Sequence, residues 1–318
     1  MILTLTLNPA VDETVWIDRL EPGSVHRVAD AHLDPAGKGI NVSRMADRLG
    51  CATMAFGLVG GDAGDMIEKA LGAEGVQHYF VRVPGETRIN FTVVERGGRA
   101  SSFYGPGPHV PAEALASLER VLERWLAVGS VLVLAGSLPR GVGAGAYATY
   151  VRMAREAGVR VVLDTSGDAL REGVAARPDL IKPNVREAEE LLDRSLGDDA
   201  AILGAARELA ARVRTVVISM GARGAICVRG GEAWRVHTPV VERRSTVGPG
   251  DSMVAGMAVA LARGAGVEAA LALGTAAGAA TAAASGTALG SAEDVRSILP
   301  RVRVERIEDA RTATERAP

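Results

Sequence analysis

Short, uninterrupted runs of apolar residues are the feature that most restricts how this chain can fold. The segments VLVLA at 131–135, RVVLD at 160–164 and TVVIS at 215–219 are apolar at every internal position. A strand with one face in water alternates polar and apolar residues, whereas a strand covered on both faces is apolar throughout. Because these runs alternate with longer segments of helical periodicity, the sequence predicts an α/β fold with a largely parallel sheet covered by helices.

The bounds of the predicted elements follow from the length of each pattern and from the Gly, Pro, Ser and Asp residues that flank it. Strands are expected at 2–7, 131–135, 160–164, 180–182, 215–219 and 225–228. Helices are expected at 40–49, 65–73, 111–127, 144–157, 185–192, 200–213, 252–263 and 267–285. The last of these is rich in Ala, Gly and Thr and too weakly apolar for a membrane span, so we interpret it as a packed helix.

Two stretches have a different pattern. Residues 12–33 and 87–103 alternate polar and apolar residues, and Gly97-Gly98 in the second stretch is a typical hairpin signal. We expect antiparallel strands that form a small lid over the ends of the parallel strands, where open α/β sheets bind ligands. The sequence has no linker or low-complexity segment, so residues 1–318 are expected to form one domain with this lid inserted. The exposed strand edges of the lid predict a homodimer.

Composition excludes several classes of protein. With 36 basic and 38 acidic residues the net charge is −2, which argues against binding to nucleic acid or to an anionic membrane surface. The apolar run MILTLTL at the start is short and ends at Asn8 and Pro9, so we interpret it as a strand and not as a signal peptide. Cys51 and Cys227 lie far apart and lack partners at metal-ligand spacing, which favours a cytoplasmic location.

The segment RSTVGPGDSMVAG at 244–256 predicts an anion-binding site. Its glycines permit a tight turn before an apolar helix, and the free N–H groups of a helix N-terminus attract anions. The alternative is an ordinary cap in which Asp251 bonds the first-turn amides. Two common nucleotide-binding patterns are absent from the sequence, because Lys38 is followed by Gly39 where a P-loop needs Ser or Thr, and no Gly-x-Gly-x-x-Gly follows the first strand.

A series of motifs occurs along nearly the whole chain in the order found in the ribokinase/PfkB superfamily of sugar kinases. They are LTLNPAVD, AGKGINVSRMADRLG, GETRIN, AGSLPRG, LDTSG, IKPNVREAEEL, ISMGARGA and STVGPGDSMVAG. The chain resembles the phosphofructokinase and tagatose-6-phosphate kinase branch, and GKGINVSR and GETRIN look most like 1-phosphofructokinases. This resemblance implies a ribokinase-like three-layer α/β/α sandwich with a small antiparallel β lid, and a requirement for ATP and Mg²⁺.

The resemblance implies a catalytic role for the last motif. Asp251 is expected to be the general base that takes the proton from the acceptor hydroxyl. The turn at Gly248 and Gly250 is expected to form an anion hole for the transferring phosphoryl group. Pro249 stands where the family usually has Ala or Ser, and it has no N–H to donate. It either removes one donor from the anion hole or only stiffens the turn, and we favour the second interpretation because the other catalytic features are intact.

The resemblance also implies a metal site and a nucleotide site. Asn184 and Glu187 match the element that positions Mg²⁺ through water, although the same pair is equally typical of a capping box. For the nucleotide residues the alternatives are a strand-end charge at Lys182 and a simple glycine-rich turn. ATP contacts are expected from Lys182, Ser219, Gly221, Gly224, Thr246 and Val247.

The acceptor sugar is expected to bind near the lid. Lys38 and Arg88 provide the cationic pair that a sugar phosphate needs and a free sugar does not. Asp12 and Asn41 are expected to bond sugar hydroxyls, and their alternatives are a surface acid and a helix cap. The full set of substrate residues is Asp12, Gly37, Lys38, Gly39, Asn41, Arg88 and Ser137.

The predicted activity is transfer of the γ-phosphoryl group of ATP to a ketohexose monophosphate. Fructose 1-phosphate is the preferred acceptor and gives fructose 1,6-bisphosphate; fructose 6-phosphate and tagatose 6-phosphate are the alternatives within the family. A non-catalytic sensor is disfavoured by the presence of Asp251, Asn184 and Glu187. A kinase for a free sugar is disfavoured by Lys38 and Arg88.

Overall fold

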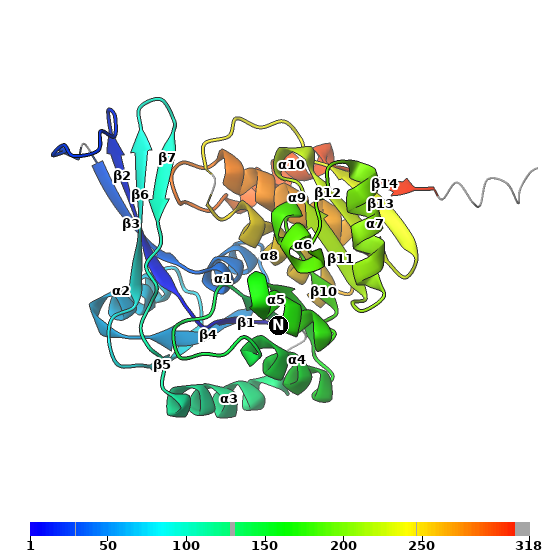
Figure 1. Ribbon diagram of the computed structural model, residues 1–318, viewed down its shortest axis with the longest axis horizontal. Helices are drawn as coiled ribbons and strands as arrows, with labels where there is room; N and C mark the ends of the chain where they lie inside the picture. Colours follow the sequence, from blue (N-terminus) through cyan, green and yellow to red (C-terminus); the bar gives the residue numbers. More distant parts are fainter. Residues whose placement is uncertain (29, 128–130, 246, 309–318) are drawn as a thin grey trace, which may run out of the picture.

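The computed structural model describes residues 1–28, 30–127, 131–245 and 247–308, and a ten-stranded sheet forms the centre of this part of the chain (Figure 1). Its strands are β1 (Ile2–Thr6), β4 (Thr53–Val59), β5 (His78–Arg82), β8 (Val131–Ala135), β9 (Arg160–Asp164), β10 (Leu180–Ile181), β11 (Thr215–Ser219), β12 (Ala225–Arg229), β13 (Glu232–His237) and β14 (Arg303–Ile307). They lie in the order β14-β13-β12-β11-β10-β9-β8-β1-β4-β5. Neighbours from β11 to β5 are parallel, and β12, β13 and β14 extend the sheet antiparallel.

Helices cover both faces of this sheet and confirm the three-layer α/β/α prediction. One face carries α1 (Lys38–Arg48), α2 (Gly61–Ala73), α8 (Pro249–Ala262), α9 (Val267–Ala283) and α10 (Ala292–Ile298). The other carries α3 (Ala112–Leu126), α4 (Ala146–Glu156), α5 (Gly167–Ala175), α6 (Val185–Leu192) and α7 (Asp199–Ala210). None of the helices in the described ranges combines the length and the apolar composition needed to cross a membrane.

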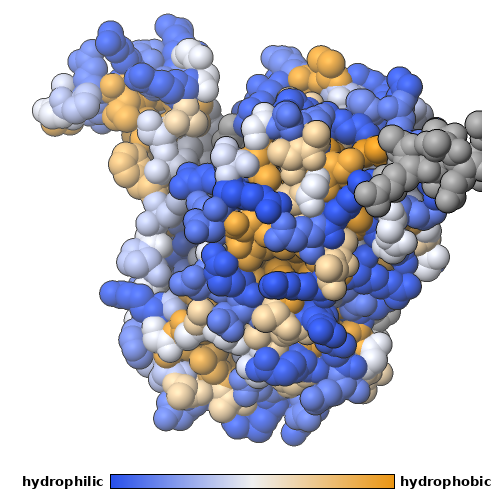
Figure 2. Space-filling view, turned by 45° about the vertical axis from the view of Figure 1, so that its right-hand side comes forward, coloured by the Kyte–Doolittle hydropathy of each residue, from blue (hydrophilic) through white to orange (hydrophobic). Residues whose placement is uncertain are grey.

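A second, four-stranded sheet forms the predicted lid at one side of the molecule (Figure 1). Its strands are β3 (Asp30–Ala36), β2 (Ala10–Ile17), β6 (Arg88–Glu95) and β7 (Ala100–Phe103), in that spatial order. Figure 2 shows it standing away from the body of the molecule. The two outer pairings are antiparallel as expected, but the central β2–β6 pairing is parallel. The reason is that β2 follows β1 and β6 follows β5. Because β1 and β5 run parallel, both lid strands start at the carboxyl ends of the strands of the main sheet and run in the same direction.

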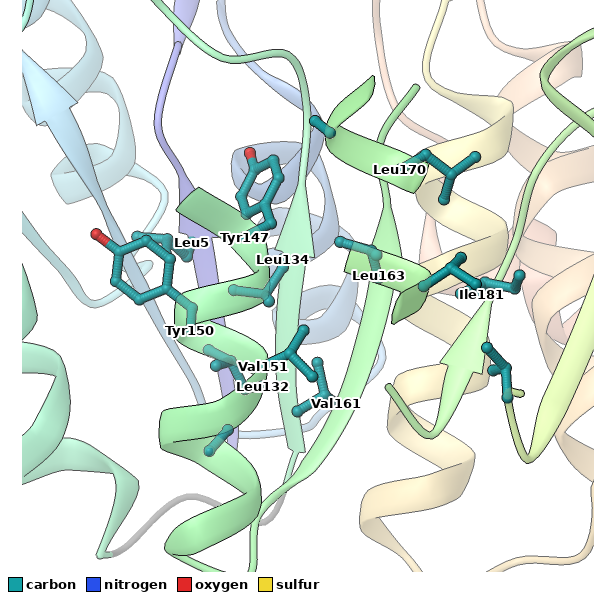
Figure 3. Packing of buried hydrophobic residues seen from close by; sticks show 14 of the residues in the cluster. Leu5, Leu132, Leu134, Tyr147, Tyr150, Val151, Val161, Leu163, Leu170 and Ile181 are labelled. Atoms are coloured by element: carbon teal, nitrogen blue, oxygen red, sulfur yellow. The ribbon is translucent and has the colours of Figure 1, made fainter. Parts of the chain in front are cut away.

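The packing of the core explains why the central strands are apolar throughout. Leu134 of β8 packs with Tyr147 and Val151 of α4 on one face of the sheet (Figure 3). Val131 and Val133 of the same strand belong to the cluster on the other face, which includes residues of α1 and α8. Because helices cover both faces of each central strand, no internal position of the strand faces water. Burial of each such aliphatic side chain stabilises the fold by about 2 kcal/mol.

Sequence patterns identified the centre of the sheet and missed its borders. Every predicted strand and helix is present with its ends shifted by a few residues, but β4, β5, β13, β14, α5 and α10 were not predicted. The edge strands β5 and β14 carry several polar residues, and α10, with seven residues, is too short for a clear helical period. The helix expected from Ser252 starts at Pro249, because proline is favoured at the first helical position.

Candidate active site

The residues Gly248-Pro249-Gly250-Asp251 form the N-terminus of α8. Gly248 is the N-cap, and its φ of 85° is the left-handed conformation that favours glycine. Pro249 is the first helical residue, where the missing N–H has no intrahelical acceptor in any case. Ser252 donates the first bond of the helix to the carbonyl of Gly248 over 2.9 Å. The N–H groups of Gly250 and Asp251 therefore lie at the open, positively polarised end of the helix.

Asp251 is buried and is held by helix α1. Its side chain does not cap α8, which rules out the simple cap interpretation; instead Nδ2 of Asn41 donates a hydrogen bond of 2.8 Å to its Oδ2. Burial raises the pKa of Asp251 to about 6, and Lys38 and Asn41 oppose that rise. A carboxylate with this pKa is ionised near neutral pH and basic enough to accept a proton.

Asp164, at the carboxyl end of β9, lies between two lysines. It is 1% exposed, and its Oδ1 is 3.4 Å from the Nζ atoms of both Lys38 and Lys182. Although burial opposes ionisation, these ammonium groups hold the pKa of Asp164 below its usual value. Its Oδ2 is buried without a hydrogen-bond partner among the described residues. Asp164 was not among the predicted site residues, although its place at the carboxyl end of a buried strand in LDTSG was a usable signal.

Asn184 and Glu187 form the capping box of α6. The Asn184 side chain accepts from the N–H of Glu187, and Oε2 of Glu187 accepts from the N–H of Asn184, both over 2.9 Å. The remaining Oε1 of Glu187 lies 3.9 Å from Nζ of Lys38, so the carboxylate also reaches the centre of the site. No cluster of three Asp, Glu, His or Cys side chains occurs in the described parts of the chain. Oε1 of Glu187 and the unpartnered Oδ2 of Asp164 are oxygen atoms of the kind that a divalent cation binds.

Asp12 and Asn90 face each other across the paired strands β2 and β6 of the lid. Nδ2 of Asn90 donates a hydrogen bond of 2.8 Å to Oδ1 of Asp12. Burial raises the pKa of Asp12, and the bond from Asn90 limits that rise. Oδ1 of Asn90 is buried without a partner in the described structure, so it is available as an acceptor. Asn90 is the last residue of the GETRIN motif and was not among the predicted site residues.

Arg88 is fixed at the base of the lid by backbone carbonyl groups. It donates hydrogen bonds to the carbonyl oxygens of Asn8 over 2.9 Å and of Gly105 over 3.2 Å. The side chain of Asn8 in turn donates to Oγ of Ser137 over 3.2 Å, which links the loops after β1 and β8. Lys38 instead contacts the carboxylates of Asp164 and Glu187 at the centre of the site.

Two glycines allow α1 to begin close to β1. Gly37 is the N-cap of α1 with a φ of 123°, and a Cβ there would lie 2.9 Å from Cγ2 of Thr6. A Cβ on Gly39 would overlap Oγ1 of the same threonine. Any larger residue would push the start of α1 outward and displace Lys38 and Asn41, which lie on this first turn and a half. The glycines thus position these two side chains.

A cavity of about 370 Å³ lies beside the N-terminus of α8. Helix α9 forms one wall; no residue of α9 was predicted to contact a ligand, because an Ala-rich helix carries no recognisable motif. Most of the lining is apolar or small, which suits the flat, largely apolar surface of a purine base. The lining residues are Ser219, Gly221, Ala222, Gly224, Thr238, Pro239, Val240, Val241, Arg243, Pro249, Gly250, Met253, Thr275, Gly278, Ala279 and Ala282.

Only some of the residues that were predicted to contact ATP line this cavity. Gly224 requires glycine, because its φ is 88° and a Cβ would overlap the carbonyl oxygen of Val236. Of the described residues, Lys182 and Val247 do not line the cavity, and Thr246 lies outside the described residues. Those that line it are Ser219, Gly221 and Gly224.

Comparison with known proteins agrees with this geometry. The pfkB family of carbohydrate kinases matches residues 5–294. The 1-phosphofructokinase of Rhodobacter capsulatus is 40% identical over 259 residues, which cover 80% of this chain and 82% of that protein. The tagatose-6-phosphate kinase of Staphylococcus epidermidis is 33% identical over 265 residues, covering 82% and 85%.

Among solved structures, the Escherichia coli phosphofructokinase-2 in complex with potassium is similar to this chain. The TM-score is 0.88 at 34% sequence identity, and the match covers 94% of this chain and 98% of that one. The motifs quoted above, the fold and the family match agree along most of the sequence, and the resemblance to sugar kinases is confirmed. The chain belongs to the pfkB family of carbohydrate kinases.

Proposed function

We propose that this kinase transfers the γ-phosphoryl group of ATP to fructose 1-phosphate and forms fructose 1,6-bisphosphate. The observation that carries the proposal is the buried carboxylate of Asp251 at the open N-terminus of α8, where Gly250 lines the neighbouring cavity. The choice of acceptor is supported by the relatives, because the one with the higher identity is a 1-phosphofructokinase. The tagatose-6-phosphate kinase makes tagatose 6-phosphate the second candidate.

In the proposed reaction Asp251 accepts the proton of the sugar hydroxyl. The hydroxyl oxygen bonds to the γ-phosphorus, the bond from that phosphorus to the bridging oxygen breaks, and ADP leaves with the electron pair. The N–H groups of Gly250 and Asp251 donate to the oxygens of the transferring group, where negative charge accumulates. Pro249 removes only the first N–H of the helix, so two donors of the predicted anion hole are retained.

The two lysines support the same step. Lys38 and Lys182 share the carboxylate of Asp164, and this arrangement places two positive charges close to Asp251. We assign Lys38 to the transferring phosphoryl group, because its contacts with Asp164 and Glu187 lie at the centre of the site. Arg88 is then the residue that binds the phosphate of the sugar, since its guanidinium is already oriented by backbone carbonyl groups.

The donor set fits Mg²⁺. Oδ2 of Asp164 is a buried carboxylate oxygen without a partner among the described residues, and Glu187 keeps one oxygen outside its capping box. These two groups would hold the ion through water, because Mg²⁺ retains several waters when it binds carboxylates. When bound, the ion neutralises charge on the nucleotide phosphates. The side chain of Asn184 is occupied by the cap and orients Glu187.

The acceptor sugar would lie along the polar face of the lid and the start of α1. Asp12 accepts from a sugar hydroxyl, and Oδ1 of Asn90, which has no partner in the described structure, accepts from another. Ser137, in the loop after β8, lies beside the same region because it is hydrogen-bonded to Asn8. The backbone of Gly37 and Gly39 completes this wall, because the two glycines allow α1 to begin close to β1.

Coupled ADP release with Mg-ATP tests the proposal directly. Fructose 1-phosphate, fructose 6-phosphate, tagatose 6-phosphate and free fructose are compared at several concentrations. We expect the highest kcat/KM for fructose 1-phosphate. We expect no turnover of free fructose, because free fructose has no phosphate for Arg88 to bind. A preference for tagatose 6-phosphate would replace the proposed acceptor. Binding of ATP without turnover of any sugar would indicate a sensor.

We also propose that the lid forms a homodimer. Leu33, Glu13, Phe91 and Phe103 lie opposite one another across all of its strands, so they share one face. On that face Leu33 is 47% exposed, Phe103 is 59% exposed and Ile89 is 48% exposed. A row of exposed apolar side chains on a sheet with open edges is stabilised when a second copy covers it.

A further inference from the structure

Arg243 is the only charged residue among the described residues that line the cavity beside α8. The other lining side chains are apolar or small and neutral, and no carboxylate is among them. A guanidinium keeps its charge at all physiological pH values, so this positive charge is permanent. It adds to the partial positive charge of the α8 N-terminus, which Pro249 and Gly250 bring to the same cavity. Such a cavity favours a ligand that is part apolar and part anionic.

The guanidinium of Arg243 is not engaged within the described structure. The residue is exposed, and no hydrogen bond or ion pair joins it to another described residue. Its neighbour Arg244 behaves differently, because it forms an ion pair of 2.8 Å with Glu242 and does not line the cavity. The two arginines therefore form a natural comparison, in which one charge is neutralised and the other is available to a ligand.

The backbone next to Arg243 is anchored. The N–H groups of Arg244 and Ser245 both donate to the carbonyl oxygen of Ala282, over 2.8 Å and 3.0 Å. Ala282 belongs to the last turn of α9 and lines the same cavity. These hydrogen bonds hold the loop against the cavity wall, and they fix the position of the backbone directly after Arg243. A cation held in this way loses little conformational freedom when it binds an anion.

We propose that Arg243 binds the phosphate chain of the nucleotide. The inference rests on the proposed function, because it takes this cavity as the nucleotide site. Arginine presents several N–H donors in one plane and matches phosphate oxygens well. Lys38 and Lys182 are already paired with Asp164, so the nucleotide must share them with a carboxylate. Arg243 is free of such competition and contributes mainly to nucleotide affinity.

The test compares Arg243→Met with its matched control Arg244→Met. Both variants remove one positive charge and keep a long side chain, and thermal unfolding checks that both are folded. We expect Arg243→Met to raise KM for ATP about tenfold, as for the loss of one charged hydrogen bond. KM for the sugar phosphate and the inhibition constant of adenosine stay within about twofold, because neither ligand contacts this group. KM for ATP also becomes less sensitive to salt, and Arg243→Lys restores part of the affinity.

Two results would overturn the inference. Equal KM values for ATP in Arg243→Met and Arg244→Met would show that Arg243 does not contact the nucleotide. A loss of adenosine affinity as large as the loss of ATP affinity would place Arg243 on the base and not on the phosphates. The failure of the proposed function looks different, because the wild-type protein would then turn over no sugar phosphate with ATP. If it still binds ATP, the Kd values for ATP of the two variants replace the KM values in the comparison, and a wild-type protein that does not bind ATP refutes the inference as well.

Discussion

The side chain of Asn41 donates a hydrogen bond of 2.8 Å to the carboxylate of Asp251, although 210 positions separate the two residues. Asn41 belongs to the first turns of α1 and Asp251 to the first turn of α8, and these helices pack together on one face of the sheet. The bond joins the two most distinctive glycine-containing motifs of the sequence. It orients the carboxylate and stabilises its ionised form, which is the form that can accept a proton.

Replacing Asp251 by Asn tests the general base. The amide has nearly the same shape but cannot accept the proton, so kcat is expected to fall by a factor of about 10² to 10⁴. Both KM values should change by less than about threefold, because the proton is transferred only in the transition state. Coupled ADP release measures the effect, and thermal unfolding confirms that the variant is folded. Retention of more than about one tenth of kcat would show that the carboxylate is not the base.

The pH dependence of kcat/KM should report the raised pKa of Asp251. Below pH values of about 6 the carboxyl is protonated and cannot act as a base, so kcat/KM rises with pH through this region. In Asn41→Leu the hydrogen bond that stabilises the ionised form is lost. The midpoint should then move to higher pH by about half a unit or more. An unchanged midpoint in this variant would mean that the bond does not influence the base.

Pro249→Ala tests whether the unusual proline limits catalysis. Alanine restores the N–H of the first helical residue, but that group precedes the donors of Gly250 and Asp251. We expect kcat to stay within about twofold. The free energy of unfolding should fall by about 0.5 kcal/mol, because the unfolded chain gains freedom without proline. Steady-state kinetics and urea denaturation measure the two effects. A tenfold rise in kcat would instead show that the missing donor weakens the anion hole.

Gly224 and Gly221 form a matched pair in the turn between β11 and β12. Both have positive φ, 88° and 60°, but a Cβ on Gly224 would overlap the carbonyl oxygen of Val236, whereas no atom lies within 4 Å of a Cβ on Gly221. Gly221→Ala should therefore cost about 1 kcal/mol. Gly224→Ala should cost more than about 3 kcal/mol, because the strand must also move. Urea denaturation gives both values, and equal losses would exclude the contact with Val236 as the constraint.

The proposed dimer can be tested by adding charge to the exposed face of the lid. Leu33→Lys and Phe103→Lys should each shift the protein toward the monomer, because a buried ammonium without a partner opposes association. Tyr79→Lys is the control, since Tyr79 is 45% exposed on β5 of the main sheet and not on the lid. Sedimentation velocity at several concentrations measures the equilibrium. A wild-type protein that remains monomeric throughout would contradict the proposal.

Local sequence patterns were sufficient to predict the buried strands and the glycine turn before α8. The apolar runs identified strands such as β8, because burial on both faces leaves no room for polar residues. Gly248 marked the turn before α8, because its φ of 85° is a left-handed conformation that favours glycine. The edge strand β14 escaped detection, since the alternation of polar and apolar residues in RVERI is weak.

Other features depend on how distant segments meet. The sequence predicted antiparallel strands in the lid because it contains a hairpin signal. The pairing of β2 with β6 is parallel instead, because both strands start at the carboxyl ends of strands of the main sheet. Lys38 contacts Asp164, which is 126 positions away, and no local pattern around Lys38 predicted this contact. Such contacts are decided by the order of strands in the sheet, which no local pattern encodes.

The sequence by itself therefore determined the family, the α/β class and the position of Asp251, because buried strands and glycine turns impose their requirements on neighbouring residues. Only the tertiary structure decided which charges share the site. It brought Asp164 between Lys38 and Lys182 and placed Arg243 on a neutral cavity, because the strand order brings together residues from distant parts of the chain.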